Sequence, residues 1–198
     1  MGKELKVTID LDNITMCYGD QKVLDSFKLE IENDHSYAII GASGSGKTTL
    51  VRILLGLEEP TSGKVHLMGD YKYPYLNAGV VFQENRLCED FTAIENVVMV
   101  NKKNSAKVAE EELLKLLPAD AIRKPVRELS GGMKRRVAIV RACSISSDML
   151  IMDEPFTGLD EENRQRAIDY IREKQGSNPL LITAHDGKGL DFCRKIEL

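Results

Sequence analysis

The chain has 198 residues, of which 42% are hydrophobic and 29% are charged, as expected for one globular domain with a substantial core. Its net charge of −4 argues against a surface that is basic overall, as in nucleic-acid or anionic-membrane binders, and no apolar run approaches the ~20 residues of a membrane span. The first residues lack the apolar stretch of a signal peptide, and the scattered cysteines include no Cys-x-x-Cys pair, which indicates reduced thiols in a cytosolic protein.

The first predicted elements are strands. Apolar residues alternate over 5–11 and again over 28–31, and an apolar segment at 37–40 runs into a glycine-rich loop. The apolar positions of the first strand are Leu5, Val7, Ile9 and Leu11. A helix is predicted at 47–57, with four residues on its apolar face: Leu50, Ile53, Leu54 and Leu57. Two further strands are predicted at 65–67 and 79–82.

The segment from 84 to 144 is mainly helical in pattern. It contains predicted helices at 105–117 and 131–142, the first with an apolar face of Val108, Leu113, Leu116 and Leu117. The remaining predicted elements are a strand at 149–152, a helix that starts at Asp160 and stops at Gly176, and strands at 180–183 and 195–197. This order predicts a single α/β domain over 1–198, with a core of mainly parallel strands (1–83 and 145–198) interrupted by a helical subdomain of about 84–144.

A complete phosphate-binding loop, G-x-x-x-x-G-K-[ST], lies between the strand at 37–40 and the helix at 47–57. Its glycines let backbone N–H groups turn toward a β-phosphate, and the helix N-terminus adds partial positive charge. Lys47 is predicted to reach the β- and γ-phosphates and Thr48 to ligate Mg²⁺. The predicted nucleotide-binding residues of this segment are Gly41, Ala42, Ser43, Gly44, Ser45, Gly46, Lys47, Thr48 and Thr49.

Two carboxylates end the apolar strand at 149–152. Asp153 lies at the carboxyl end of a predicted parallel strand, where α/β sheets hold their ligands, and is predicted to bind Mg²⁺. Glu154 follows directly and is predicted to orient or deprotonate a water aimed at the γ-phosphate.

A second glycine turn, Leu129-Ser130-Gly131-Gly132, lies about ninety residues after the first. One polypeptide cannot easily fold both turns onto one triphosphate, whereas two copies facing head to tail can exchange them. The two motifs together therefore predict an ATPase that works as a dimer.

These motifs give the chain, over nearly its whole length, a close resemblance to the nucleotide-binding subunits of ATP-binding cassette (ABC) transporters. Residues 129–133 resemble the signature motif, whose Ser130 hydroxyl and Gly132 N–H are implied to contact the γ-phosphate bound by the partner. The resemblance also implies a small antiparallel β-subdomain beside the P-loop NTPase core. ATP and Mg²⁺ are the implied cofactors.

Four further positions match functional positions of that family. Gln83 resembles the glutamine that senses Mg²⁺ and the attacking water, and His185 resembles the switch histidine that holds the γ-phosphate beside Glu154. Tyr18 fits the aromatic residue that stacks on adenine. Asp160 ends a segment, 157–160, that resembles the loop crossing to the opposite site. The implied catalytic residues are Lys47, Gln83, Glu154 and His185, and the implied metal ligands are Thr48, Gln83 and Asp153.

The chain departs from the family pattern at Met133, where the signature usually has Gln or Glu. We expect altered affinity for the partner's nucleotide but intact chemistry. A basic run at 134–136, with Arg141, is interpreted as the solvated face of a helix whose apolar face is Met133, Val137 and Val140, in preference to a nucleic-acid site.

As the resemblance implies, the partners are separate transmembrane permease subunits, contacted near 83–91, and a second cassette, identical or related. The protein is then expected on the cytoplasmic face of the cell membrane, without a nucleic-acid partner. Residues 82–87 and 94–97 are similar to importers of nitrate, sulfonates and related small anions. The alternatives are an exporter ATPase, a soluble ABC ATPase acting on ribosomes or DNA, and an unrelated phosphate-loop kinase, which would leave residues 129–132 unexplained.

Overall fold

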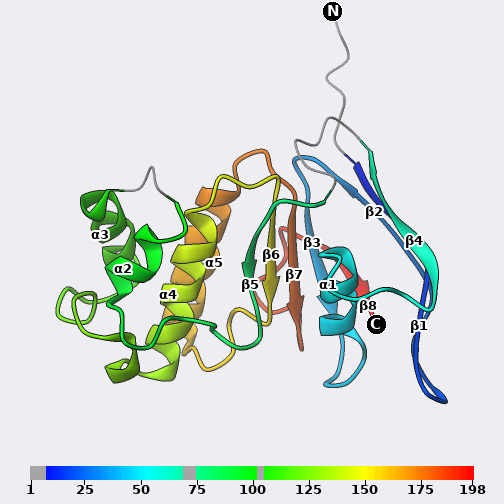
Figure 1. Ribbon diagram of the computed structural model, residues 1–198, viewed down its shortest axis with the longest axis horizontal. Coiled ribbons are helices and arrows are strands. Elements are labelled where there is room, and N and C mark those ends of the chain that lie inside the picture. The colour runs from blue at the N-terminus through cyan, green and yellow to red at the C-terminus, as the bar shows by residue number, and fades with distance from the viewer. Residues whose placement is uncertain (1–7, 69–74, 102–104) are drawn as a thin grey trace, which may run out of the picture.

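The computed structural model describes residues 8–68, 75–101 and 105–198 (Figure 1). Leu5 and Val7 of the first predicted strand lie outside the described residues. Among the described residues, five strands form a parallel sheet in the order β5 (Ala78–Val81), β6 (Met149–Asp153), β7 (Leu180–Ala184), β3 (Ser36–Ile40) and β8 (Arg194–Glu197). The predicted parallel α/β core is therefore confirmed.

A second sheet is antiparallel and contains three described strands in the order β2 (Gln21–Glu32), β1 (Thr8–Tyr18) and β4 (Ser62–Met68). Ile9 of β1 pairs with Ile31 on one side and with Leu67 on the other, so the apolar residues of the three strands share a face. This sheet is the antiparallel β-subdomain that the family resemblance implied.

The parallel sheet separates two hydrophobic cores. Leu150 and Met152 of β6 belong to the core that also contains residues of α4 (Gly131–Cys143) and α5 (Glu161–Gln175). Their neighbours Met149 and Ile151 face the other core, with α1 (Lys47–Leu54) and the antiparallel sheet. Figure 1 shows these two layers on opposite sides of the central strands. The alternation follows from the two-residue period of a strand and explains why β6 and β7 are apolar throughout.

The mainly helical segment contains α2 (Ala93–Val98), α3 (Ala106–Leu114), a short 3₁₀ helix (Val126–Glu128) and α4. Thr92 and Glu95 form a capping box at the start of α2, which satisfies donors that the first turn would otherwise leave free. In Figure 1, α2 and α3 lie beyond α4, away from the sheet. None of the helices within 8–68, 75–101 and 105–198 combines the length and the apolar content needed to cross a membrane.

Two predicted helices end earlier than expected. The first ends at Leu54 instead of 57, and Leu57 is 54% exposed instead of lying on the buried face. Gly56 stops it in the left-handed region (φ 66°), where its N–H donates to the Ile53 carbonyl and the Leu57 N–H donates to the Arg52 carbonyl. The second ends at Leu114, and Val108 is 44% exposed because Ala109 and Leu113 form the buried face of this helix.

Replacing Gly56 by Ala is expected to lower the free energy of unfolding by about 1 kcal/mol, because an L-residue is disfavoured in the left-handed region. An added Cβ would meet no atom within 4 Å, so the backbone conformation alone causes the loss. Urea denaturation measures it, and Gly56→Asn, which tolerates this region better, should recover part of it. An unchanged denaturation midpoint in Gly56→Ala would contradict this explanation of the helix end.

Candidate nucleotide site

The phosphate loop connects the carboxyl end of β3 to the first residue of α1. Gly46 forms the N-cap of α1 with φ 100°, and a Cβ there would lie 2.9 Å from Cγ1 of Val23. Only glycine fits this turn, which directs the first N–H groups of α1 toward the loop. A helix N-terminus that faces a loop in this way is suited to binding phosphate.

The side chain of Lys47 binds the backbone of the phosphate loop itself. Its Nζ donates to the carbonyls of Gly41 (2.8 Å) and Ala42 (2.9 Å), and its side chain is only 4% exposed. The hydroxyl of Ser45 is buried without a hydrogen-bond partner among the described residues. A buried donor at a helix N-terminus, next to a lysine, fits a bound phosphate oxygen.

Asp153 is anchored by two hydroxyl groups. Thr48 Oγ1 donates to its Oδ2 (2.9 Å) and Thr183 Oγ1 donates to its Oδ1 (2.6 Å), while the residue is 1% exposed. Among the described residues, no group of three or more His, Cys, Asp or Glu side chains could hold a metal by itself. A hydroxyl and one carboxylate are instead the donors typical of Mg²⁺ that is also bound by substrate phosphates, so these residues fit the expected Mg²⁺–nucleotide complex.

Glu154 lies between Lys47 and His185. Its Oε1 is 3.5 Å from Nζ of Lys47 and its Oε2 is 3.2 Å from Nε2 of His185. The backbone of Glu154 has φ 49°, a left-handed conformation that is uncommon for a non-glycine residue and is held by N–H bonds to Thr183. This turn directs a nearly buried carboxylate toward the phosphate loop, where it can act on a water molecule.

Two cavities adjoin the loop. One, of about 210 Å³, is lined by loop residues together with Tyr18, Gln83 and Glu154. The other, of about 290 Å³, is lined by Thr48, Asp153 and Gln83 among others. Gln83 therefore borders both the predicted nucleotide space and the predicted metal position.

Tyr18 reaches the first cavity from the end of β1 and is 47% exposed. Its hydroxyl donates to Glu58, whose other carboxylate oxygen accepts from Arg52 Nε at 3.0 Å. The bond to Glu58 is the main reason why the pKa of Tyr18 is raised. The ring is fixed at its hydroxyl end and open to solvent, as a stacking residue requires.

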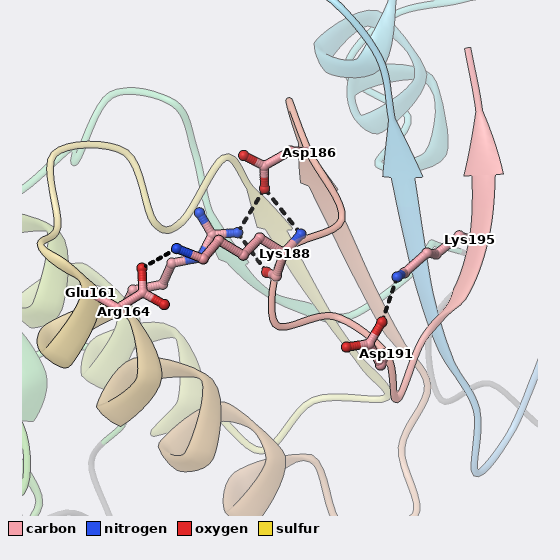
Figure 2. A network of polar contacts seen from close by, with 6 residues as sticks. All are labelled: Glu161, Arg164, Asp186, Lys188, Asp191 and Lys195. Carbon is pink, nitrogen blue, oxygen red and sulfur yellow. Dashed lines mark hydrogen bonds and ion pairs between the residues drawn. The ribbon is translucent and has the colours of Figure 1, made fainter.

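The loop that follows His185 is held by an ionic network (Figure 2). Arg164 of α5 donates to Asp186 Oδ1 (3.0 Å) and to the Lys188 carbonyl (2.7 Å), and Lys188 Nζ binds Glu161 at 2.6 Å. The bond from the backbone N–H of Lys188 is the main reason why the pKa of Asp186 is lowered. This network ties the His185 loop to the start of α5.

The signature turn lies elsewhere in the subunit. Ser130 is the N-cap of α4 and accepts from the Met133 N–H at 3.3 Å, and a Cβ on Gly132 would lie 3.1 Å from the Gly158 carbonyl. Neither cavity beside the phosphate loop includes any of Ser130, Gly131 and Gly132 among its described lining residues. Asp160 caps α5 by accepting from the Asn163 N–H at 2.8 Å, and that bond is the main reason why its pKa is lowered.

The interpretation of residues 134–136 as a solvated face is wrong for the arginines. Arg135 is 5% exposed and Arg136 is 8% exposed. Arg135 donates to two backbone carbonyls at the end of β5, and Arg136 donates to the Leu116 carbonyl and to Asn163. The predicted apolar positions Val137 and Val140 are buried, but α4 is enclosed on several sides, so its polar positions are buried too.

Thr183 is a site residue that the sequence analysis missed. It is fully buried in β7, and its hydroxyl both donates to Asp153 and accepts from the Glu154 N–H at 3.0 Å. The sequence does contain a signal for this role. The segment 180–184, which directly precedes His185, is apolar except for Thr183.

Replacing Thr183 by Val keeps the side-chain shape but removes this hydroxyl. We expect the free energy of unfolding to fall by about 1–3 kcal/mol, because buried partners lose a hydrogen bond. ATP turnover should also fall, because Asp153 and Glu154 lose a shared support. Denaturation and phosphate-release assays measure both effects, with Thr183→Ser as the control that retains the hydroxyl. Unchanged turnover in Thr183→Val would show that the support is dispensable.

Comparisons with known proteins identify the family to which the chain belongs. The family model described as ABC transporter matches residues 24–157. The Nod factor export ATP-binding protein I of Cupriavidus metallidurans is 37% identical over 193 residues, covering 89% of this chain and 62% of that protein, so the chain spans less than two thirds of that relative's length. The probable sulfate/thiosulfate import ATP-binding protein CysA of Chlorella vulgaris is 34% identical over 205 residues, covering 97% of this chain and 87% of that protein.

A solved structure is also similar over the whole fold. The dimeric post-hydrolysis state of the ATP-binding cassette MJ0796, bound to ADP and Pi, matches with a TM-score of 0.82 and 27% identity, covering 96% of this chain and 94% of that chain. With the family match spanning well over half of the sequence, the chain belongs to the ABC transporter family as one of its ATP-binding ATPase cassettes.

Proposed function

We propose that this cassette closes head to tail with a second copy, or with a related cassette, around two ATP molecules and drives a separate membrane permease. One observation carries the proposal. Lys47, Glu154 and His185 converge beside the phosphate loop, whereas the signature turn of the same subunit lies on neither cavity there. A second cassette supplies the missing turn.

In each site, the phosphate loop and Lys47 bind the triphosphate, and Tyr18 stacks on the adenine. Thr48, Asp153 and Gln83 hold Mg²⁺, which polarises the phosphate oxygens when bound. Glu154 orients or deprotonates the attacking water, and His185, 3.2 Å away, holds the carboxylate and the γ-phosphate in place.

The partner's signature turn completes the site. The Ser130 oxygen already accepts from the Met133 N–H, so its own proton is free to be donated to a γ-phosphate oxygen of the facing subunit. The Gly132 N–H and the N-terminal end of α4 add positive potential there, and Asp160 lies on the segment that crosses between the sites.

The permease is proposed to dock on 83–91, which borders the cavity beside Thr48 and Asp153. Docking there would place the cassette on the cytoplasmic face of the membrane. Import of a small solute, from the nitrate and sulfonate group of substrates, is the proposed direction. The sulfate/thiosulfate import relative supports it, and the Nod factor export relative provides the competing direction.

A crosslinking purification tests the proposal. A photoreactive residue replaces Leu87, inside 83–91, and the tagged Glu154→Gln protein is captured from detergent-solubilised native cells with ATP present. We expect a crosslink to a polytopic membrane protein, and none from a control with the photoreactive residue at Glu30, on the antiparallel sheet. Crosslinks only to ribosomal proteins or nucleic acid would overturn the transporter proposal and leave the dimerising ATPase.

A further inference from the structure

Arg135 is a buried cation that the proposed reaction does not yet use. No described carboxylate lies within ion-pair distance of it, although it is 5% exposed. Its Nη1 donates to the Phe82 carbonyl at 2.6 Å, and its Nη2 donates to the Gln83 carbonyl at 2.5 Å. Burial lowers the pKa of the Arg135 guanidinium, and the charges of Asp153, Glu154 and Glu84 oppose that effect. The two backbone carbonyls are therefore the hydrogen-bond partners that the structure gives this buried guanidinium.

The two hydrogen bonds fix a particular stretch of backbone. A guanidinium presents its donors in a rigid planar fork, so binding two successive carbonyls sets both their position and their orientation. The Gln83 side chain extends from this backbone and borders both cavities beside the phosphate loop. Arg135 thus holds the backbone of Gln83, and Arg135 itself is not among the described residues that line either cavity.

Arg135 also belongs to α4, the helix that begins directly after Ser130. One rigid helix therefore carries the signature turn at its N-terminus and, about one turn further, the side chain that holds Gln83. Any shift of the signature turn as it engages a nucleotide on the partner would move the anchor of Gln83 with it.

We infer that Arg135 is a positioning residue for ATP hydrolysis, which fixes Gln83 in its metal- and water-binding position and couples that position to the signature turn on α4. The inference rests on the proposed role of Gln83. Replacing a residue that hydrogen-bonds a metal ligand, without touching the metal, typically changes metal affinity or activity by about 10- to 100-fold.

The test compares Arg135→Met with a matched control on the same helix. Arg141 makes the same kind of contact two turns later, donating to the carbonyls of Arg86 (2.8 Å) and Asn85 (3.0 Å), but it does not touch Gln83. Hydrogen–deuterium exchange of the segment 79–88, measured without nucleotide, should increase in both variants. Only Arg135→Met should raise the Mg²⁺ concentration for half-maximal ATPase activity and lower kcat, each by about 10-fold or more, with KM for ATP unchanged.

A Gln83→Ala variant distinguishes a failure of the proposed role of Gln83 from a failure of the role of Arg135. It should raise the Mg²⁺ requirement, and adding Arg135→Met to it should raise that requirement no further. An unchanged Mg²⁺ requirement in Gln83→Ala would refute the proposed role of Gln83. The role of Arg135 alone would be overturned if the Mg²⁺ requirement rose in Gln83→Ala but not in Arg135→Met. It would also be overturned if the Mg²⁺ requirement rose equally in Arg135→Met and Arg141→Met.

Arg135→Lys keeps the test decisive if Arg135→Met does not fold. An ammonium retains the charge but cannot reproduce the fork that holds two carbonyls, so the Mg²⁺ requirement should still rise. A wild-type Mg²⁺ requirement in Arg135→Lys would refute the inference, because charge without the paired hydrogen bonds would then be sufficient.

Discussion

Replacing Glu154 by Gln is expected to abolish ATP hydrolysis while leaving ATP binding intact, with kcat reduced at least about 100-fold. The amide has nearly the same shape and can still reach His185 and Lys47, which lie 3.2 and 3.5 Å from the carboxylate oxygens. It cannot accept a proton from water at neutral pH, so the step that reopens the dimer is blocked while closure is not.

Size-exclusion chromatography with ATP and Mg²⁺ should therefore show the Glu154→Gln protein as a stable dimer, and the wild type as a monomer once its ATP is spent. Glu59→Gln, at an exposed position outside the site, serves as the matched control and should behave as the wild type. A Glu154→Gln protein that stays monomeric and still hydrolyses ATP would remove Glu154 from its role.

The part of the site that the sequence predicts is made by short motifs at strand ends. Residues that follow β3, β6 and β7 must lie at one edge of the sheet, because these strands are parallel and adjacent. Once the motifs after 40, 152 and 184 are placed at the ends of these adjacent strands, Lys47, Glu154 and His185 converge. Parallel pairing, together with the adjacent order of β6, β7 and β3 in the sheet, accounts for that convergence.

What the sequence analysis missed depends on how α4 is enclosed. A polar run at 134–136 resembles a solvated face only if the helix is covered on one side. Here the sheet lies against one side of α4, and the loop after β5 and the helices around it cover the polar positions. Backbone carbonyls of that loop, which have no sequence signature, accept from Arg135 and make its burial possible, and they also accept from the half-buried Arg141.

The early end of α1 has a related cause. Leu57 continues the apolar spacing of the helix, so periodicity alone extends it, but Gly56 supplies a left-handed residue that closes the turn first. The glycine decides where the helix ends, in preference to the apolar spacing, because the two hydrogen bonds that close the turn satisfy carbonyls at the helix end.

Replacing Lys47 by Met is expected to weaken ATP binding by about 10- to 100-fold, the effect of losing a charged hydrogen bond to phosphate. Methionine keeps most of the length of the buried stem, so the fold should be retained, although the carbonyls of Gly41 and Ala42 lose the bonds that Nζ donates to them. Isothermal titration with ATP measures the affinity, with Lys64→Met, at an exposed position on β4, as the control.

A double variant, Lys47→Met with Glu154→Gln, tests whether bound ATP is what joins the two cassettes. If ATP itself joins the two cassettes, the double variant should remain monomeric at ATP concentrations that dimerise Glu154→Gln, because weakened binding removes the molecule that both subunits contact. A dimer that formed equally well in the double variant would mean that protein surfaces alone hold the subunits together. The proposed exchange of the signature turn between two sites would then lose its physical cause, since in that proposal the turn contributes to closure only through contact with the γ-phosphate of the facing subunit.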